Sequence, residues 1–296
     1  MIKTSLIAVA CAISAAAYLP SCEVLFPSTV AGDVSDGGGS GTDTAAPMLD
    51  AGAADGDATV RDAATDALFA DATFGGPFCV VHAAHTHCFD FDSVGNAMVG
   101  WDGNNLGGGT AVALDPTFFR SSPNSMRSSV QNGGPTGTYA VLTENLPLDA
   151  SQLVLAADVR PELPPGATYE GAELLGTHVT GTFGYYGVGV GFSQAGPALS
   201  VLWPTDDAGG YASRTETFQS LVADDAGWTR IEMTVDFGPP LAVALTFNGL
   251  SEWNGPFSGT AAVVGATPAG VAVGVVAVGD GGPIAVNYDN VTIDVK

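Results

Sequence analysis

Five residues that could bind a metal or cross-link the chain lie in one ten-residue stretch. Cys79 and Cys88 are nine positions apart and enclose His82, His85 and His87. The two thiols could form a disulfide in an oxidising compartment, or they could join the imidazoles around a zinc ion. Five candidate ligands this close together match no common spacing of a structural zinc site. We therefore expect the disulfide and keep zinc as the alternative.

A carboxylate near the C-terminus is the second candidate. Asp289 is in phase with the apolar Val291, so we expect it to face the core. The apolar residues before it, up to Tyr288, have the opposite phase, so a bulge is predicted between Tyr288 and Val291. A carboxylate that faces the core needs a partner. Calcium held by Asp90, Asp92 and Asp289 would provide one, because calcium takes six to eight oxygen ligands. The alternative is that Asp289 caps turn amides or pairs with an arginine.

Three aromatic residues are candidates for stacking on sugar rings: Tyr185, Trp203 and Trp253. Tyr185 begins a predicted strand in which alternate residues are glycines, at positions 187, 189 and 191. A face without side chains either packs closely against a neighbour or leaves room for a ligand. Trp253 lies in a stretch rich in glycine and proline, where we expect a loop. The alternative for each aromatic residue is a place in the core or at its margin.

Catalytic motifs are absent from the sequence. It contains no Gly-x-Ser-x-Gly elbow, no P-loop and no dinucleotide fingerprint. Glu232 and Asp236 share a face of a predicted strand, but no third acid follows in the same spacing. We therefore predict no catalytic residue and a protein that is not an enzyme.

These side chains belong to a region whose pattern is that of β-strands. Residues 151–160, 228–237 and 241–247 alternate between apolar and polar residues, and residues 271–278 are apolar on both faces. Turn signals separate these runs. Residues 78–296 are thus predicted to form one all-β domain, a two-sheet antiparallel sandwich. The net charge of −23 disfavours nucleic acid and anionic lipid as partners.

The first 77 residues have the pattern of an export signal and a tether. Residues 1–22 carry Lys3, an apolar run and a final Leu-Pro-Ser-Cys, which resembles a bacterial lipobox with Cys22 as the lipidated residue. Cleavage after residues 15–17 (AAA) is the alternative, and Pro20 departs from the lipobox pattern. Residues 23–77 are acidic and rich in Gly, Ala and Asp, so we expect a disordered linker.

Several short motifs together resemble those of exported Gram-negative proteins with a laminin-G-like or concanavalin A-like jelly roll. They are the cysteine pair leading into residues 88–92 (CFDFD), Trp101, residues 121–126 (SSPNSM) and residues 288–291 (YDNV). The resemblance covers residues 78–296 and implies a lectin-type sandwich that binds carbohydrate or protein. Related folds include laminarinase-type glycoside hydrolases, but their Glu-x-Asp-x-x-Glu strand is absent from this chain.

The sequence therefore predicts an exported, lectin-like binding protein of the cell envelope. We expect its lipid to anchor it in the outer membrane, and the alternative is a soluble secreted or periplasmic protein. Carbohydrate is the favoured ligand. The alternatives are a protein-binding adhesion or structural lipoprotein and an unusual glycoside hydrolase. No cofactor is expected apart from the structural calcium considered above.

Overall fold

The computed structural model describes residues 78–131, 138–162, 171–181, 184–193, 196–204, 211–218, 223–224, 226–238, 240–256, 267–278 and 283–296. The expected signal peptide and linker, with Cys22, lie outside these ranges. In the described part, no helix is long and apolar enough to cross a membrane.

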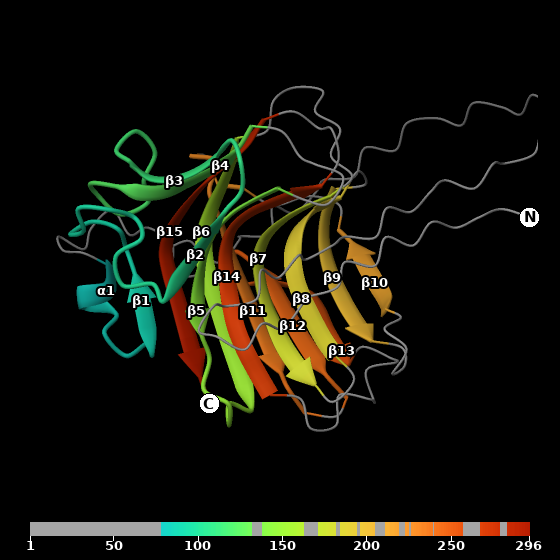
Figure 1. The fold of residues 1–296 in the computed structure, drawn as a ribbon. Helices are drawn as coiled ribbons and strands as arrows, with labels where there is room; N and C mark the ends of the chain where they lie inside the picture. The colour runs from blue at the N-terminus through green and yellow to red at the C-terminus, as the bar shows by residue number, and fades with distance from the viewer. Residues whose placement is uncertain are drawn as a thin grey trace, which may run out of the picture.

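Two antiparallel sheets form the sandwich (Figure 1). Sheet A has eight strands in the order β13 (Leu250–Pro256), β12 (Ala242–Phe247), β11 (Thr229–Asp236), β6 (Gln152–Glu162), β15 (Ile284–Val295), β4 (Ser125–Val130) and β3 (Thr110–Asp115), with β1 (His87–Phe89) also paired to β15. Sheet B has seven strands in the order β10 (Tyr211–Thr217), β9 (Gly196–Pro204), β8 (Gly184–Ser193), β7 (Gly171–Gly181), β14 (Thr267–Val278), β5 (Thr138–Asn145) and β2 (Gly103–Leu106). The one described helix, α1 (Phe78–Val81), precedes β1. The all-β, two-sheet prediction is confirmed.

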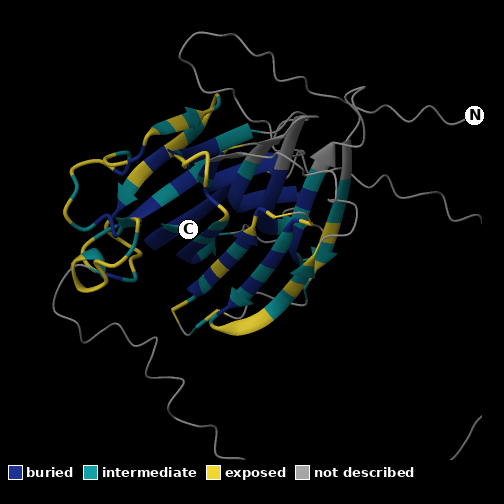
Figure 2. Cartoon of the chain, turned by 90° about the horizontal axis from the view of Figure 1, so that it is seen from below, coloured by how far each residue is buried: buried dark blue, intermediate teal, exposed yellow. Residues whose placement is uncertain are grey.

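The core lies between the two sheets and follows the alternation expected from the sequence. In β11, for example, Ile231, Met233 and Val235 are fully buried. The intervening Glu232 and Asp236 are exposed. Val271 to Ala277 in β14 are buried on both faces apart from the half-buried Ala272. Figure 2 shows buried residues along the strands and exposed ones mainly in loops and at strand ends. Burying a large apolar side chain contributes roughly 1.5–3 kcal/mol, so this core is the main source of stability.

A bulge in β15 is present between Tyr288 and Val291, as predicted, and it follows Asp289. The register with β6 shifts between Asp289 and Thr292, and Asn290 has a φ of 49°. Tyr288 belongs to the core. Asp289 pairs with Asp158 of β6, and residues paired in a sheet point to the same face. The neighbours of Asp158 in β6, Ala157 and Val159, face the core, so Asp158 and Asp289 both point away from it. The expectation that Asp289 faces the core was therefore wrong. It lies on the outer face of sheet A, the face turned away from sheet B, and is buried there.

Candidate functional site

Cys79 and Cys88 form a disulfide that joins α1 to β1, as predicted. No thiolate is thus left for the zinc alternative. Two of the histidines between them contact carboxylates instead: Nδ1 of His85 lies 2.7 Å from Asp294, and Nδ1 of His87 lies 3.3 Å from Glu144. Across the described ranges, no group of three or more His, Cys, Asp or Glu side chains could hold a metal ion.

The three aspartates proposed for calcium accept hydrogen bonds from the protein itself. Asp90 accepts from the backbone N–H groups of Cys79 and Asp92, and Asp92 accepts from that of Asn124. Asp289 accepts from three backbone N–H groups and one hydroxyl, as described below. This arrangement favours the alternative, in which Asp289 caps turn amides, and calcium binding stays a prediction.

Each of the three aromatic candidates lies in a strand, and the structure describes the side chain of Trp253. Trp253 lies in strand β13 rather than in a loop, so that expectation was wrong; it packs against the core, with Arg214 5.4 Å from its ring. Tyr185 pairs with Thr180 and Trp203 with Ala212, but the side chains of both aromatics lie outside the part that the structure describes.

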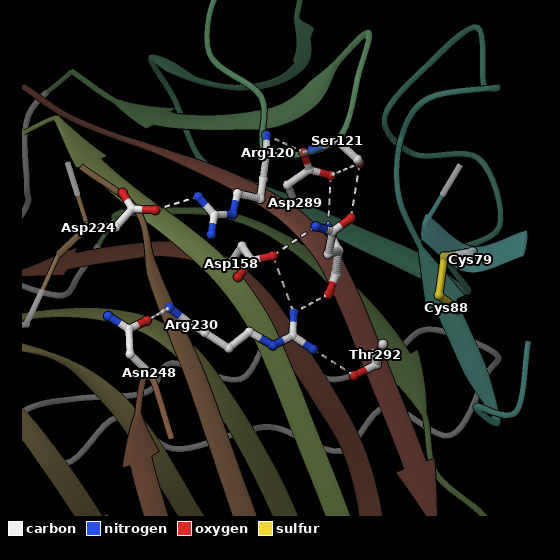
Figure 3. Close-up of polar contacts among 11 residues, drawn as sticks. Cys79, Cys88, Arg120, Ser121, Asp158, Asp224, Arg230, Asn248, Asp289 and Thr292 are labelled. Carbon is white, nitrogen blue, oxygen red and sulfur yellow. Dashed lines mark hydrogen bonds and ion pairs between the residues drawn. A yellow bond between two sulfur atoms is a disulfide. The ribbon is translucent and has the colours of Figure 1, made fainter. Parts of the chain in front are cut away.

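A polar network occupies the outer face of sheet A around Asp289 (Figure 3). One carboxylate oxygen of Asp289 accepts hydrogen bonds from the backbone N–H groups of Arg120 (2.7 Å) and Ser121 (2.9 Å). The other accepts from the Ser121 hydroxyl (3.2 Å) and the Asn290 N–H (2.8 Å). Burial raises the pKa of Asp289 well above its usual value, and the backbone hydrogen bonds from Ser121, Arg120 and Asn290 oppose the rise. Two of the motifs noticed in the sequence, residues 121–126 and 288–291, are therefore in direct contact.

Two arginines extend this network across sheet A. Arg230 in β11 donates to the carbonyl oxygen of Asn290 at 2.6 Å and lies 3.6 Å from Asp158. Arg120 forms an ion pair with Asp224. The network therefore ties β15 to its neighbouring strands and fixes the segment at residues 116–124 against the sheet.

An open pocket of about 340 Å³ lies on the same outer face, beside the network. Its floor includes Ala285, which pairs with Ser129 on one side and Glu162 on the other. Arg127 and Gln131 complete its polar lining. Arg127 donates to Glu162 at 3.2 Å. Because Ala285 has a short side chain between longer neighbours, the sheet is hollowed at this point.

Charges around the pocket nearly cancel. Glu162 lies between Arg127 and Arg160, 3.6 Å from the latter, and Arg127 lies 3.9 Å from Asp115. Two cations and two anions therefore lie together, all on a face that carries four of the eight basic residues of the chain. The pocket offers hydrogen-bond donors and acceptors without a strong field of one sign.

The outer face of sheet B, where the sequence allowed either close packing or room for a ligand, carries a buried acid. Glu173 is 3% exposed, and its carboxyl group lies over Gly176 and Gly189, which leave the space that it fills. Its Oε2 has no hydrogen-bond partner among the described residues. Burial raises the pKa of Glu173 to about 8. At Gly189 the close-packing alternative therefore holds, and the face is not open there.

His178 follows on the same face of β7. It pairs with Gly187 of β8 and with Gly270 of β14, so glycines flank it on both sides. Burial lowers the pKa of His178 to about 4, so both His178 and Glu173 are neutral at pH 7.

Sequence reasoning missed the Arg127–Glu162 pocket and Glu173. The signal for Glu173 was a lone acid inside the apolar run 172–175, with glycine at 176. The pocket had no local signal, because its residues come from β4, β6 and β15, which are far apart in the chain.

The fold is that of a concanavalin A-like jelly roll. No protein-family model and no curated protein sequence matches the chain. Among solved structures, it is similar to an endo-beta-1,4-glucuronan lyase from the fungus Trichoderma reesei, with a TM-score of 0.56 and 12% identity over 72% of this chain and 96% of that one.

Two further similarities are more distant. The alginate lyase vAL-1 from Chlorella virus gives a TM-score of 0.46 and 13% identity over 66% of this chain and 93% of that one. The binding domain of Botulinum neurotoxin serotype G gives a TM-score of 0.39 and 9% identity over 64% of this chain and 42% of that one. At these identities the similarity concerns the fold alone. The disulfide suggests that the domain lies outside the cytoplasm.

Proposed function

We propose that this chain is an exported carbohydrate-binding protein whose saccharide site is the pocket at Arg127 and Glu162 on the outer face of sheet A. The observation that carries the proposal is the Arg127–Glu162 pair placed beside the short floor residue Ala285. A sugar ring needs donors and acceptors for its hydroxyls and an apolar contact for its C–H groups. The pocket combines Arg127, Glu162, Ser129 and Gln131 with the apolar Ala285 and Pro283.

Pocket size and charge support a small neutral ligand. A volume of about 340 Å³ is at the lower end of the range for ligand pockets, roughly 300–1,000 Å³, so it suits one or two sugar residues. Neutral sugars are favoured because Arg127 and Arg160 are already balanced by Glu162 and Asp115. The similarity of fold to a polysaccharide lyase is consistent with a saccharide ligand but adds no site residue.

We also propose that the protein binds its saccharide without cleaving it. Glu232 and Asp236 are exposed and four residues apart in one strand, so about 13 Å separates their positions. Paired glycosidase carboxyl groups are closer, about 5–9.5 Å apart. Cleavage of an acidic polysaccharide by elimination needs a group that neutralises the sugar carboxylate, and the two arginines beside the pocket, Arg127 and Arg160, already form ion pairs with Glu162 and Asp115.

Blocking the floor of the pocket tests the proposal. Affinity electrophoresis of the exported protein through neutral and acidic glycans should show retardation on a neutral glycan. The variant Ala285→Leu should weaken that retardation at least about tenfold, because the added side chain fills the pocket. Ala113→Leu is the matched control, since Ala113 is exposed on the same face in β3 and pairs with Arg127. Thermal melts would establish that both variants are folded.

Three results would contradict the proposal. Retardation on no glycan would remove its basis, and specific capture of an envelope protein would then favour the adhesion alternative. Equal binding by wild type and Ala285→Leu would exclude this pocket. Release of reducing ends or of unsaturated sugars by the wild-type protein would overturn the statement that it binds without catalysis.

A further inference from the structure

The segment between β3 and β4, residues 116–124, is held against sheet A at several points along its length. The Thr117 N–H donates to Asp115 at 2.7 Å, and the Ser125 hydroxyl donates to the Phe118 carbonyl at 2.5 Å. Further along, Asp289 accepts from the N–H groups of Arg120 and Ser121. The backbone of this segment is therefore fixed before any ligand arrives.

This fixed segment presents two phenylalanines to solvent. Phe118 is 37% exposed and Phe119 is 40% exposed, whereas Phe247 is fully buried in the core. Large apolar side chains that remain exposed on a rigid segment are typical of binding surfaces, because little conformational entropy is lost when they are covered. The hydrogen bonds to Asp289 thus fix the backbone immediately after the two phenylalanines.

The Phe118 ring adjoins the pocket through a continuous line of contacts, and Phe119 is the next residue of the same segment. The guanidinium of Arg160 lies 3.7 Å from the centre of the Phe118 ring. Arg160 also lies 3.6 Å from Glu162, which accepts a hydrogen bond from Arg127 in the pocket. Its Nε donates to the Ala226 carbonyl at 3.3 Å, so Arg160 is itself fixed. The aromatic segment and the pocket are therefore parts of one surface.

We propose that Phe118 and Phe119 form a stacking platform that extends the pocket, so that the ligand is a chain of at least two neutral pyranose residues with mainly equatorial hydroxyls. Such rings present C–H groups on their faces, and these faces pack on aromatic rings, while the hydroxyls at their edges bind polar groups. One residue occupies the pocket at Arg127 and Glu162, and the next lies over the phenylalanines. This inference rests on the proposed function and adds the length and the class of the saccharide.

The dependence of affinity on chain length tests the inference. Isothermal titration of the exported protein with glucose, cellobiose, cellotriose and cellotetraose should show a gain of about fivefold or more between the monosaccharide and the trisaccharide, by analogy with other aromatic pairs. Phe119→Ala should remove most of this gain and leave the affinity for the monosaccharide unchanged. Phe119→Tyr should retain it. Leu250→Ala is the control, because Leu250 is exposed in the strand at the opposite edge of sheet A.

The outcomes separate the two proposals. One outcome supports the pocket but contradicts the platform: the sugars bind, Ala285→Leu abolishes their binding, and the affinity does not depend on chain length. The platform is also wrong if Phe119→Ala and Leu250→Ala have equal effects on the trisaccharide. If no glycan binds at all, and Phe119→Ala instead abolishes capture of a protein, both proposals are wrong. Phe118→Ala is a second variant of the platform, and its melting temperature shows whether the contact with Arg160 also supports the fold.

Discussion

A Cβ atom added to Gly189 would lie 2.5 Å from Oε2 of Glu173. Gly189 belongs to β8 and Glu173 to β7, and the carboxyl group lies across the two strands on the outer face of sheet B. A second glycine, Gly176, is needed in the same way, since a Cβ there would lie 2.0 Å from Oε1. The glycines in these strands therefore accommodate one buried side chain.

Gly189→Ala is expected to destabilise the fold by roughly 1–3 kcal/mol, the usual cost of overpacking. The added methyl group collides with the carboxyl group and Cγ of the buried Glu173, whose side chain must shift to make room. Urea unfolding measures the loss. Gly108→Ala is the control, because a Cβ there meets nothing within 4 Å. The double variant Gly189→Ala, Glu173→Ala should be less destabilised than the sum of the two single variants, and strict additivity would contradict the contact.

The contribution of Glu173 to stability should fall as the pH rises from about 4.5 to about 8, because its carboxyl group has a pKa raised from 4.5 to about 8 in the folded chain. Below pH 4.5 Glu173 is protonated in both the folded and the unfolded chain, so its titration does not change the free energy of unfolding there. Between the two values unfolding releases a proton, and rising pH therefore favours unfolding by about 1.4 kcal/mol per pH unit.

The measurement for Glu173 is the free energy of unfolding in urea at several pH values between 4.5 and 9, for wild type and Glu173→Gln. The difference between the two proteins isolates Glu173 from the other titrating groups. The variant should be relatively more stable at high pH than at low pH. A difference that does not change with pH would show that Glu173 has an ordinary pKa.

Asp289→Asn should destabilise the domain by roughly 2–4 kcal/mol, because a buried carboxyl group that accepts four hydrogen bonds is replaced by an amide whose NH₂ group cannot accept them. Differential scanning calorimetry measures this loss, with Glu232→Gln on the exposed face of β11 as the control. The same experiment with EDTA tests the calcium prediction. Amide capping predicts a melting temperature that EDTA does not change, whereas bound calcium predicts a lower one in wild type and no change in Asp289→Asn.

Lipidation of Cys22 stays a prediction from the sequence. Cys22→Ala should move the exported protein from the membrane fraction to the soluble fraction, because the acyl chains supply the membrane affinity. Fractionation followed by mass spectrometry of the N-terminal peptide measures it. A mature N-terminus at Tyr18 would instead support the alternative cleavage site.

The local pattern of apolar and polar residues was enough to predict the two-sheet architecture. Most of the contacts that it did not predict join residues far apart in the chain. The alternation in 228–237 and 241–247 predicted β11 and β12 with the correct core face, because period two directly reflects the pleat. Asp289 was assigned to the wrong face because phase shows that a bulge exists but not on which side of a residue it lies. Arg120 and Asp289 are 169 positions apart, so no local pattern could pair them.

The disulfide has a mechanical consequence for a domain held from its N-terminal side. Tension that enters at α1 passes through the Cys79–Cys88 bond directly into β1, and the residues between the cysteines are bypassed. From β1 it reaches residues 291–293 of β15 through backbone pairing. Since β15 also pairs with β6 and β4, a load that crosses the three-residue strand β1 reaches an interior strand of sheet A rather than one of the edge strands β3 and β13.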